Sequence, residues 1–504
     1  MRAAPAEASP TGRAAPRPAA IPGRAVAPRS AALPLVVLLL WVIVPLPWAG
    51  DLGMHAATIE RLRHDLLHPG NPLVDADTPS PYYSPWMLLL GCVARATGLS
   101  AFGVLRLAAL AGLALLVTGV WRYVRTLSAH RAAPALAALS LVLLWGTAVI
   151  NWSGFLSLNS LALTVSYPSV FTLGLSFHLW AWLTRALRTP TEWRTWPALG
   201  VLWAAILLCH QFTGLVATLG GLASVLSARP ARALWPRLAA AAALGLLVLW
   251  LWPYYDFFAL LSAGDDLEGV HRALYTDFLG RYWLALLGVA ALALRWRRDR
   301  RDPLVIFFLL GAPVCAAGFA DGHYSWGRAL PAALIPAQLA AALEVVQGGL
   351  RAVRTCWAWA LAAALAVGAW TQAGVLGYAV GRDALPDVLA ADYTPPWPGY
   401  DWITPYVRYG EVVMARDLPS RQIPAYGPYT VAPGYPDFFL PDEFRRELAV
   451  QRYYTRGTPA LARREILREY GVRWVLDGRG PRSDPDLRAV AHGPGGEVLY
   501  AVVP

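Results

Sequence analysis

An apolar run that ends at a carboxylate decides how this chain is organised: residues 33–55 read LPLVVLLLWVIVPLPWAGDLGMH. The part from Leu33 to Ala49 carries no charge, and its length approaches the roughly 20 residues that a helix needs to cross a bilayer. Asp51 comes directly after it, and a long polar stretch follows. The sequence therefore predicts a first membrane helix with a carboxylate at its far end.

The composition of the whole chain extends this prediction to many membrane spans. Of the 504 residues, 57% are hydrophobic and only 15% are charged, which is more apolar than a soluble fold of this size requires. The formal net charge of +11 comes from arginine, because the chain contains no lysine. These arginines lie mainly between hydrophobic segments, so we expect them to set membrane topology and expect no nucleic-acid partner. The four cysteines show neither disulfide-like nor zinc-ligand spacing.

The apolar segments and the arginines together predict a topology. Arginine clusters fall on alternate connections, and the strongest lies between residues 295 and 301. Under the positive-inside rule these connections face the cytoplasm, with the N-terminus inside and the C-terminus outside. The predicted fold is mainly α, a polytopic bundle of about eleven transmembrane helices. The predicted spans are 33–49, 103–121, 133–150, 166–184, 196–210, 212–228, 238–254, 281–295, 303–319, 329–346 and 357–380.

We expect three parts along the chain. Residues 1–32 form an Arg/Pro/Ala-rich leader, predicted to be disordered and cytoplasmic. Residues 33–380 form the transmembrane bundle, with a large first external loop at 50–102. From residue 381 to 504 the long apolar runs stop, while proline, tyrosine and charge increase. There a helix is predicted over 459–470, and strands over 472–476 and 497–503, which indicates a small extracytoplasmic α/β domain.

The first external loop is predicted to hold two helices that are too short to span. Residues 55–68 have the apolar spacing of an amphipathic helix, and such a helix would lie in the membrane interface. Residues 84–96 form a second short apolar stretch. Between them, Tyr82 and Tyr83 suit the headgroup level, where they could anchor the loop or stack on sugar rings.

This arrangement resembles the class C (GT-C) integral membrane glycosyltransferases, in particular the bacterial type that uses polyprenyl-phosphate sugars. Members have an acidic residue at the outer end of the first helix, a large first external loop with two helices along the membrane, and often a C-terminal extracytoplasmic domain. The resemblance covers nearly the whole chain as an architecture. At residue level it rests on Gly50-Asp51 with His55, on His68-Pro69 with Asn71-Pro72, and on Trp326 with Arg328.

The resemblance implies roles for several residues. Sugar transfer from a lipid phosphate needs a base for the acceptor hydroxyl and a cationic group for the leaving phosphate. Asp51 is then the base, and His55, one helical turn later, orients it or contacts substrate. Arg328 is expected to contact the phosphate of the lipid donor, with His323 and Tyr324 as companions. The acceptor would be an envelope glycan, glycolipid or protein outside the cell.

One departure from the family pattern leaves a role open. Members often carry paired acidic residues after the first helix, whereas Leu52 follows Asp51 here. A second acidic residue therefore has four candidates: Glu60, Asp65, Asp75 and Asp77.

Further polar residues stand near the predicted outer face. His210 interrupts an apolar run and could contact substrate or make a helix-packing hydrogen bond. His271 lies in the predicted external loop 254–280. Asp265, Asp266 and Glu268 in that loop could hold a divalent cation, although a solvated acidic loop is the simpler interpretation, and no metal site is assigned.

Three other functions stay open. A transporter or lipid-linked-sugar flippase would usually show internal repeats of the hydrophobic pattern, which are absent. A polysaccharide polymerase or ligase shares the polytopic layout but usually places its large loop later in the chain. A pseudoenzyme that keeps the fold as a binding subunit is compatible with the missing second acidic residue.

Overall fold

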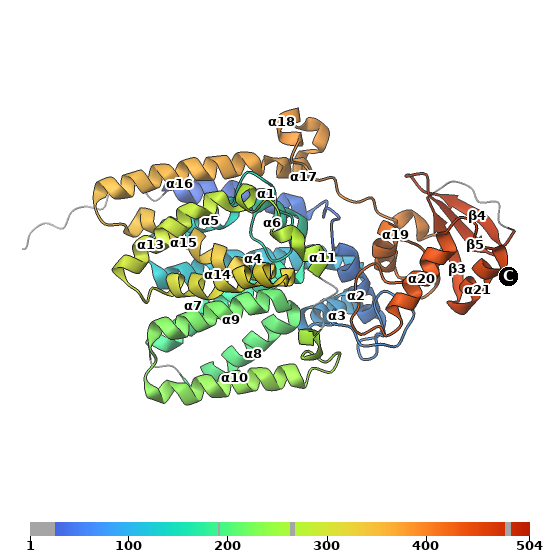
Figure 1. The fold of residues 1–504 in the computed structure, drawn as a ribbon, viewed down its shortest axis with the longest axis horizontal. Helices are drawn as coiled ribbons and strands as arrows, with labels where there is room; N and C mark the ends of the chain where they lie inside the picture. The colour runs from blue at the N-terminus through green and yellow to red at the C-terminus, as the bar shows by residue number, and fades with distance from the viewer. Residues whose placement is uncertain (1–25, 190–191, 263–267, 479–484, 504) are drawn as a thin grey trace, which may run out of the picture.

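The computed structural model describes residues 26–189, 192–262, 268–478 and 485–503. Its helices form a long bundle, and a smaller unit built around a β-sheet lies at one end of that bundle (Figure 1). The predicted leader lies outside the described residues as far as residue 25. The long bundle helices are α1 (Val26–Ile43), α4 (Ala101–Leu127), α5 (Ala133–Leu143), α7 (Pro168–Arg188), α8 (Thr195–Cys209), α9 (Gln211–Ala228), α10 (Trp235–Trp250), α13 (Leu286–Arg298), α14 (Pro303–Asp321), α15 (Pro331–Gln347) and α16 (Arg351–Thr371).

Each of the predicted spans overlaps one of these helices, but α1 ends at residue 43, α5 at 143 and α16 at 371, before the predicted 49, 150 and 380. Among the described residues, seven helices are long and apolar enough to cross a membrane. The number is eight if α6 (Leu158–Thr164) and α7, which are bent by 119° at their junction, form one span. The shorter apolar helices in the described part of the chain are the apolar part of α1 (Ala32–Ile43), α5 and α8, so the predicted first span is not one of the seven. A mainly helical membrane bundle is confirmed, whereas the total of eleven spans stays a prediction.

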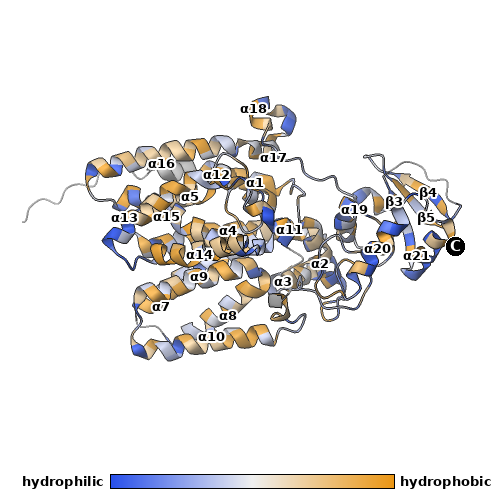
Figure 2. Cartoon of the chain, in the orientation of Figure 1, coloured by the Kyte–Doolittle hydropathy of each residue, from blue (hydrophilic) through white to orange (hydrophobic). Residues whose placement is uncertain are grey.

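The two ends of the bundle differ in their chemistry. The helix bodies are predominantly hydrophobic, and hydrophilic residues concentrate at the α13–α14 connection and in the C-terminal unit (Figure 2). The α13–α14 connection holds the strongest arginine cluster and lies at the end away from the C-terminal unit (Figure 1). Small residues permit close packing inside the bundle: a Cβ on Gly119 of α4 would lie 2.7 Å from the carbonyl oxygen of Gly174 on α7.

The loop 50–102, which is predicted to be external, forms the two predicted helices, α2 (Leu52–His64) and α3 (Pro85–Thr97). The α2 helix begins immediately after Asp51 and ends earlier than the predicted residue 68. It ends there because the carboxylate of Asp65 accepts hydrogen bonds from the backbone amides of Leu67 and His68, which turns the chain. Ser84 caps α3 by accepting from the amide of Met87.

The C-terminal unit contains a five-stranded mixed sheet in the order β2-β1-β3-β5-β4. Strand β1 (Val412–Met414) is parallel to both β2 (Tyr429–Thr430) and β3 (Val472–Asp477). Strand β5 (Val498–Val502) is antiparallel to β3 and to β4 (Leu487–His492). The predicted helix and two predicted strands correspond to α21 (Ala460–Glu469), β3 and β5, so the small α/β unit is confirmed. The sequence patterns did not predict α19 (Asp417–Gln422), α20 (Glu443–Tyr454), β1, β2 or β4.

Buried polar contacts join this unit to the loop 50–102. Arg61 of α2 is fully buried and donates to the carbonyl oxygens of Gly427 and Pro428 at 2.7 and 2.6 Å. Asn71 donates to the carboxylate of Asp437 at 2.6 Å. Desolvating a guanidinium is costly unless its donors are satisfied, so these contacts hold the unit in one position against α2.

Candidate active site

Asp51 occupies the N-cap position of α2, and the backbone before it is held from two directions. Tyr167, at the bend between α6 and α7, donates its hydroxyl to the carbonyl oxygen of Ala49. Tyr435 of the C-terminal unit donates to the carbonyl oxygen of Gly50 at 2.9 Å. Gly50 has a φ of +51°, which lets the chain turn sharply into the helix. The carboxylate is therefore positioned by the bundle and by the C-terminal unit together.

Two guanidinium groups act on this carboxylate. Burial raises the pKa of Asp51 above its ordinary value, and the nearby positive charges of Arg328 and Arg421 oppose that rise. Arg328 comes from the bundle and Arg421 from the C-terminal unit. Among the ion pairs between described residues, none joins Asp51 to either arginine within 4.0 Å. The carboxylate thus keeps its oxygens available beside two cations.

His55 lies one turn after Asp51 on the same helix. Its backbone amide donates to the carbonyl oxygen of Asp51 at 3.1 Å, and its ring meets the Tyr167 ring edge-on at 4.7 Å. Burial lowers the pKa of His55 to about 3, so the imidazole is neutral at any physiological pH. A neutral imidazole can donate or accept one hydrogen bond but carries no charge that would compensate Asp51.

Arg328 is only 7% exposed and lies in the 3₁₀ turn η7 (Tyr324–Ala329) that leads into α15. Its guanidinium lies over the rings of Phe212 and Trp152, 4.6 and 5.5 Å from their centroids. No carboxylate of a described residue forms an ion pair with it. The turn itself is fixed by Glu268, which accepts from the backbone amide and hydroxyl of Ser325 at 2.8 and 2.6 Å. A buried arginine without a carboxylate partner is prepared to bind an external anion.

His210 and His271 complete the surroundings of Arg328. The amide of Thr213 donates to Nδ1 of His210 at 3.1 Å, so the proton of the neutral ring belongs on Nε2, which lies 3.5 Å from the Arg328 guanidinium. His210 therefore offers Arg328 no acceptor in this state. His271 packs on the two rings that flank Arg328, with centroid distances of 5.5 Å to each.

The structure brings some of the sequence candidates together and separates others. Asp51, His55, Arg328, His210 and His271 lie in one region. Tyr82 borders it: its hydroxyl donates to the carbonyl oxygen of Pro436 at 3.0 Å, and burial, with the charges of Asp437 and Asp51 nearby, raises the pKa of its phenol.

Three other candidates make their contacts elsewhere. Tyr83 is buried and donates to the carbonyl oxygen of Gly70 at 2.8 Å. His323 is exposed and stacks on Trp326, and Tyr324 contacts Tyr275, away from the guanidinium of Arg328.

The candidates for a second acidic residue stay apart from Asp51. Glu60 stands about 13 Å further along α2 by helix rise and pairs with Arg63 at 3.6 Å. Asp65 ends α2, and Asp75 and Asp77 are exposed. The described residues contain no group of three or more His, Cys, Asp or Glu side chains that could hold a metal ion, and Asp265 and Asp266 lie outside them.

The sequence patterns missed Arg421, Tyr435, Tyr167, Trp152 and Phe212. Tyr167 had a local signal, since Tyr-Pro interrupts an otherwise apolar segment, as expected at a break between helices. Arg421 and Tyr435 had none, because they reach the site only through the packing of the C-terminal unit on α2.

Solved structures show which fold this arrangement belongs to. ArnT from Cupriavidus metallidurans in the apo state aligns over 95% of this chain and 98% of its own, with a TM-score of 0.51 and 14% identity. The arabinofuranosyltransferase AftD from Mycobacteria aligns over 94% of this chain, with a TM-score of 0.56 and 18% identity, and this chain spans 40% of its length. ArnT bound to undecaprenyl phosphate aligns over 96% of this chain, with a TM-score of 0.49. No protein-family model and no curated protein matches. The chain has the GT-C fold.

Proposed function

We propose that this chain is a membrane glycosyltransferase that moves a sugar from a polyprenyl-phosphate donor to an extracytoplasmic acceptor, with inversion at the anomeric carbon. The observation that carries the proposal is the position of Asp51, an available carboxylate that lies beside the buried and unpaired cation Arg328. We further infer that the N-terminus is cytoplasmic, and that the C-terminal unit lies outside the plasma membrane.

Asp51 has the chemistry of the general base. An acceptor hydroxyl attacks the anomeric carbon and forms the new C–O bond, while the bond from that carbon to the phosphate oxygen breaks. Asp51 takes the hydroxyl proton, and the bonding electrons leave with the polyprenyl phosphate. A raised pKa makes the carboxylate a stronger base than an ordinary surface aspartate, which favours proton transfer near neutral pH. No metal is needed for this step as written.

Arg328 supports the departure of the phosphate. A planar guanidinium with free donors matches two phosphate oxygens, and the aromatic rings of Phe212 and Trp152 hold it in place without neutralising it. Negative charge grows on the bridging oxygen as the sugar–phosphate bond breaks, so a cation fixed beforehand lowers that barrier. Arg328 lies in the turn just before α15, a helix that is almost entirely buried, and this gives the cation a rigid support.

The solved relatives agree with this assignment at the level of the fold. AftD is described as an arabinofuranosyltransferase. A transporter or flippase would instead use a site near the bilayer midplane. Here the chemical groups gather at helix ends, beside the C-terminal unit.

The substitution Asp51→Asn tests the proposal. It keeps the size of the side chain and removes the base, so transfer should fall by about 10²- to 10⁴-fold while the protein still folds. The measurement is transfer from a synthetic polyprenyl-phosphate sugar by the purified protein, together with envelope glycans from a deletion strain complemented by each variant. Asp383→Asn is the matched control, because Asp383 is an exposed aspartate with no role in the proposed site. Undiminished transfer by Asp51→Asn would remove Asp51 as the base.

A further inference from the structure

A polar cavity of about 460 Å³ lies in the C-terminal unit, at the edge of the sheet where the parallel strands β1 and β2 both end. Residues 415–418 follow β1, residues 432–434 follow β2 closely, and α20 forms the opposite wall. Ligands of open parallel sheets bind outside the carboxyl ends of the strands, because loops and helix ends present their polar groups there. The cavity also has the size of a small-molecule site, about 300–1,000 Å³.

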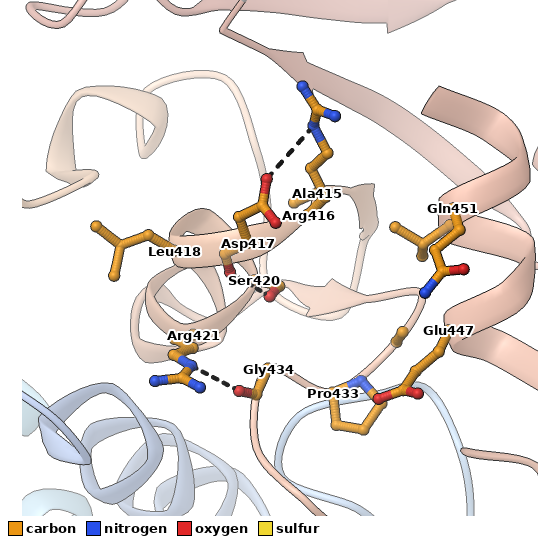
Figure 3. Close-up of a pocket in the computed structure, with 12 residues that line it drawn as sticks. Ala415, Arg416, Asp417, Leu418, Ser420, Arg421, Pro433, Gly434, Glu447 and Gln451 are labelled. Carbon is orange, nitrogen blue, oxygen red and sulfur yellow. Dashed lines mark hydrogen bonds and ion pairs between the residues drawn. The ribbon is translucent and has the colours of Figure 1, made fainter. Parts of the chain in front are cut away.

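Free polar groups enter this cavity from α20. Glu447 and Gln451 are one helical turn apart on α20, both are exposed, and both line the cavity, with Glu447 directed toward the side of Pro433 (Figure 3). Within the described part of the chain, the carboxylate of Glu447 and the side-chain amide of Gln451 have no hydrogen-bond or ion-pair partner. On the opposite wall, Arg416 pairs with Asp417 at 3.6 Å. Arg421 uses Nε to donate to the carbonyl oxygen of Gly434 at 2.8 Å.

The cavity adjoins the candidate active site through Arg421. This side chain lines the cavity, and its charge also acts on the carboxylate of Asp51. Its backbone carbonyl packs so closely on α2 that a Cβ on Gly53 would collide with it. Tyr435, which follows Gly434 of the cavity wall, donates to Gly50, the residue before Asp51. Arg421 therefore stands between the cavity and the base.

The residues that line the cavity indicate the chemical class of its ligand. Two guanidinium groups and two carboxylates leave the wall with no net charge, so neither an anion nor a cation finds a matching field. A lipid chain would need a more apolar lining than this one. Sugar hydroxyls act as donors and acceptors at once, and they match carboxylate, amide, hydroxyl and guanidinium groups that alternate around a cavity.

We propose that this cavity is the subsite for a neutral, hydroxyl-rich saccharide chain of the acceptor, and that Glu447, Gln451 and Arg421 hold it so that its growing end reaches Asp51. This inference rests on the proposed function, because it names the substrate class of the same site. It makes the C-terminal unit part of acceptor recognition. The bundle supplies the group that holds the donor phosphate.

The test uses the purified full chain in lipid nanodiscs with two probes, a linear arabinofuranose tetrasaccharide and a linear mannose tetrasaccharide. Glu447→Ala and Gln451→Ala should each weaken binding of at least one probe by about tenfold or more, measured by calorimetry and saturation-transfer NMR. Glu465→Ala is the matched control, because Glu465 is an exposed glutamate on α21 outside the cavity. Failure of both probes to bind, or equal binding by the parent and both variants, overturns the proposal. Binding of inorganic phosphate that depends on Arg416 and excludes both tetrasaccharides also overturns it.

A second readout separates this inference from the proposed function. Without acceptor, slow hydrolysis of the polyprenyl-phosphate sugar should require Asp51 and be the same in Glu447→Ala as in the parent. If Glu447→Ala lowers hydrolysis as much as Asp51→Asn, the cavity is not an acceptor subsite. If Asp51→Asn keeps full transfer while Glu447→Ala still loses saccharide binding, the proposed base is wrong and the saccharide site stands.

Discussion

Arg298 and Arg328 both lie beside buried groups, but their partners differ in kind. Arg298, at the arginine-rich end of the bundle, meets the two carboxylate oxygens of buried Glu344 at 2.8 Å each. Its neighbour Arg295 donates to Asp302. Arg328, at the end near the C-terminal unit, meets aromatic rings and a neutral imidazole, and no described carboxylate pairs with it. At the arginine-rich end, both arginines have a carboxylate partner, whereas Arg328 has none among the described residues.

The paired arginine is expected to contribute to stability, whereas the arginine without a carboxylate partner is expected to bind an anion. A buried charge that is fully paired contributes to a single packed arrangement, and removing one partner exposes the desolvation cost of the other. An uncompensated buried cation is unfavourable in the free protein, so it persists only where the surrounding structure holds it in place. Arg328 lies just before the start of α15, and Glu344, the carboxylate that pairs with Arg298, lies near its end. Substitutions at its two ends should therefore have different consequences.

After loss of the base itself in Asp51→Asn, the largest effect is expected from Arg328→Gln. Losing a fixed cation at the leaving phosphate should lower kcat by about 10²- to 10³-fold, as removal of one oxyanion donor does. The thermal midpoint should not fall, because the variant removes an unpaired buried charge. Turnover of a synthetic polyprenyl-phosphate sugar and thermal unfolding in detergent measure the two quantities. A loss of stability without a loss of rate would assign Arg328 to the packed framework.

A smaller effect is expected from Asp302→Ala, and it concerns the free energy of unfolding. Asp302 accepts from Arg295 at 2.9 Å and caps α14 by accepting from the amide of Leu304 at 2.9 Å. Losing the cap and one partner of the half-buried Arg295 guanidinium, which keeps Glu344 at 3.9 Å, should lower the free energy of unfolding by about 2 kcal/mol. Turnover at 25 °C should stay at the parental level, because the arginine-rich end is remote from Asp51. Asp299→Ala is the control, since Asp299 is an exposed acid in the same connection.

Sequence patterns were informative where the signal is local. Apolar length located the bundle helices, the carboxylate after the first run marked Asp51, and the resemblance to GT-C transferases at Trp326 and Arg328 marked Arg328. Period-two alternation gave β3, but β2 has two residues and is too short for any alternation to show. The contribution of Arg421 could not be predicted, because it depends on α19 packing against α2. That packing follows from long-range contacts of Arg61 and Asn71, and no local pattern encodes them.

The smallest expected effect is a shift in the pKa of Asp51 after the substitution Arg421→Gln. Burial raises the pKa of Asp51, and Arg328 and Arg421 oppose the rise. Arg421→Gln removes one opposing charge, so the pKa should rise further. Because the base must be unprotonated to act, the acid limb of the kcat–pH profile should then move to higher pH. His55 cannot produce this limb, since its pKa of about 3 keeps the ring neutral throughout the range.

Arg416→Gln provides the matched control for this shift. Arg416 lines the same cavity, but it pairs with Asp417 and lies over the Tyr454 ring at 4.7 Å, so it should not move the limb. On the neutral plateau, Arg421→Gln should change kcat by less than about tenfold, because the base itself is retained. A limb that moves to lower pH in Arg421→Gln, or equally in both variants, would mean that the C-terminal unit does not tune Asp51. The site would then be a property of the bundle alone, and the contacts that fix the C-terminal unit against α2 would serve only to hold it there.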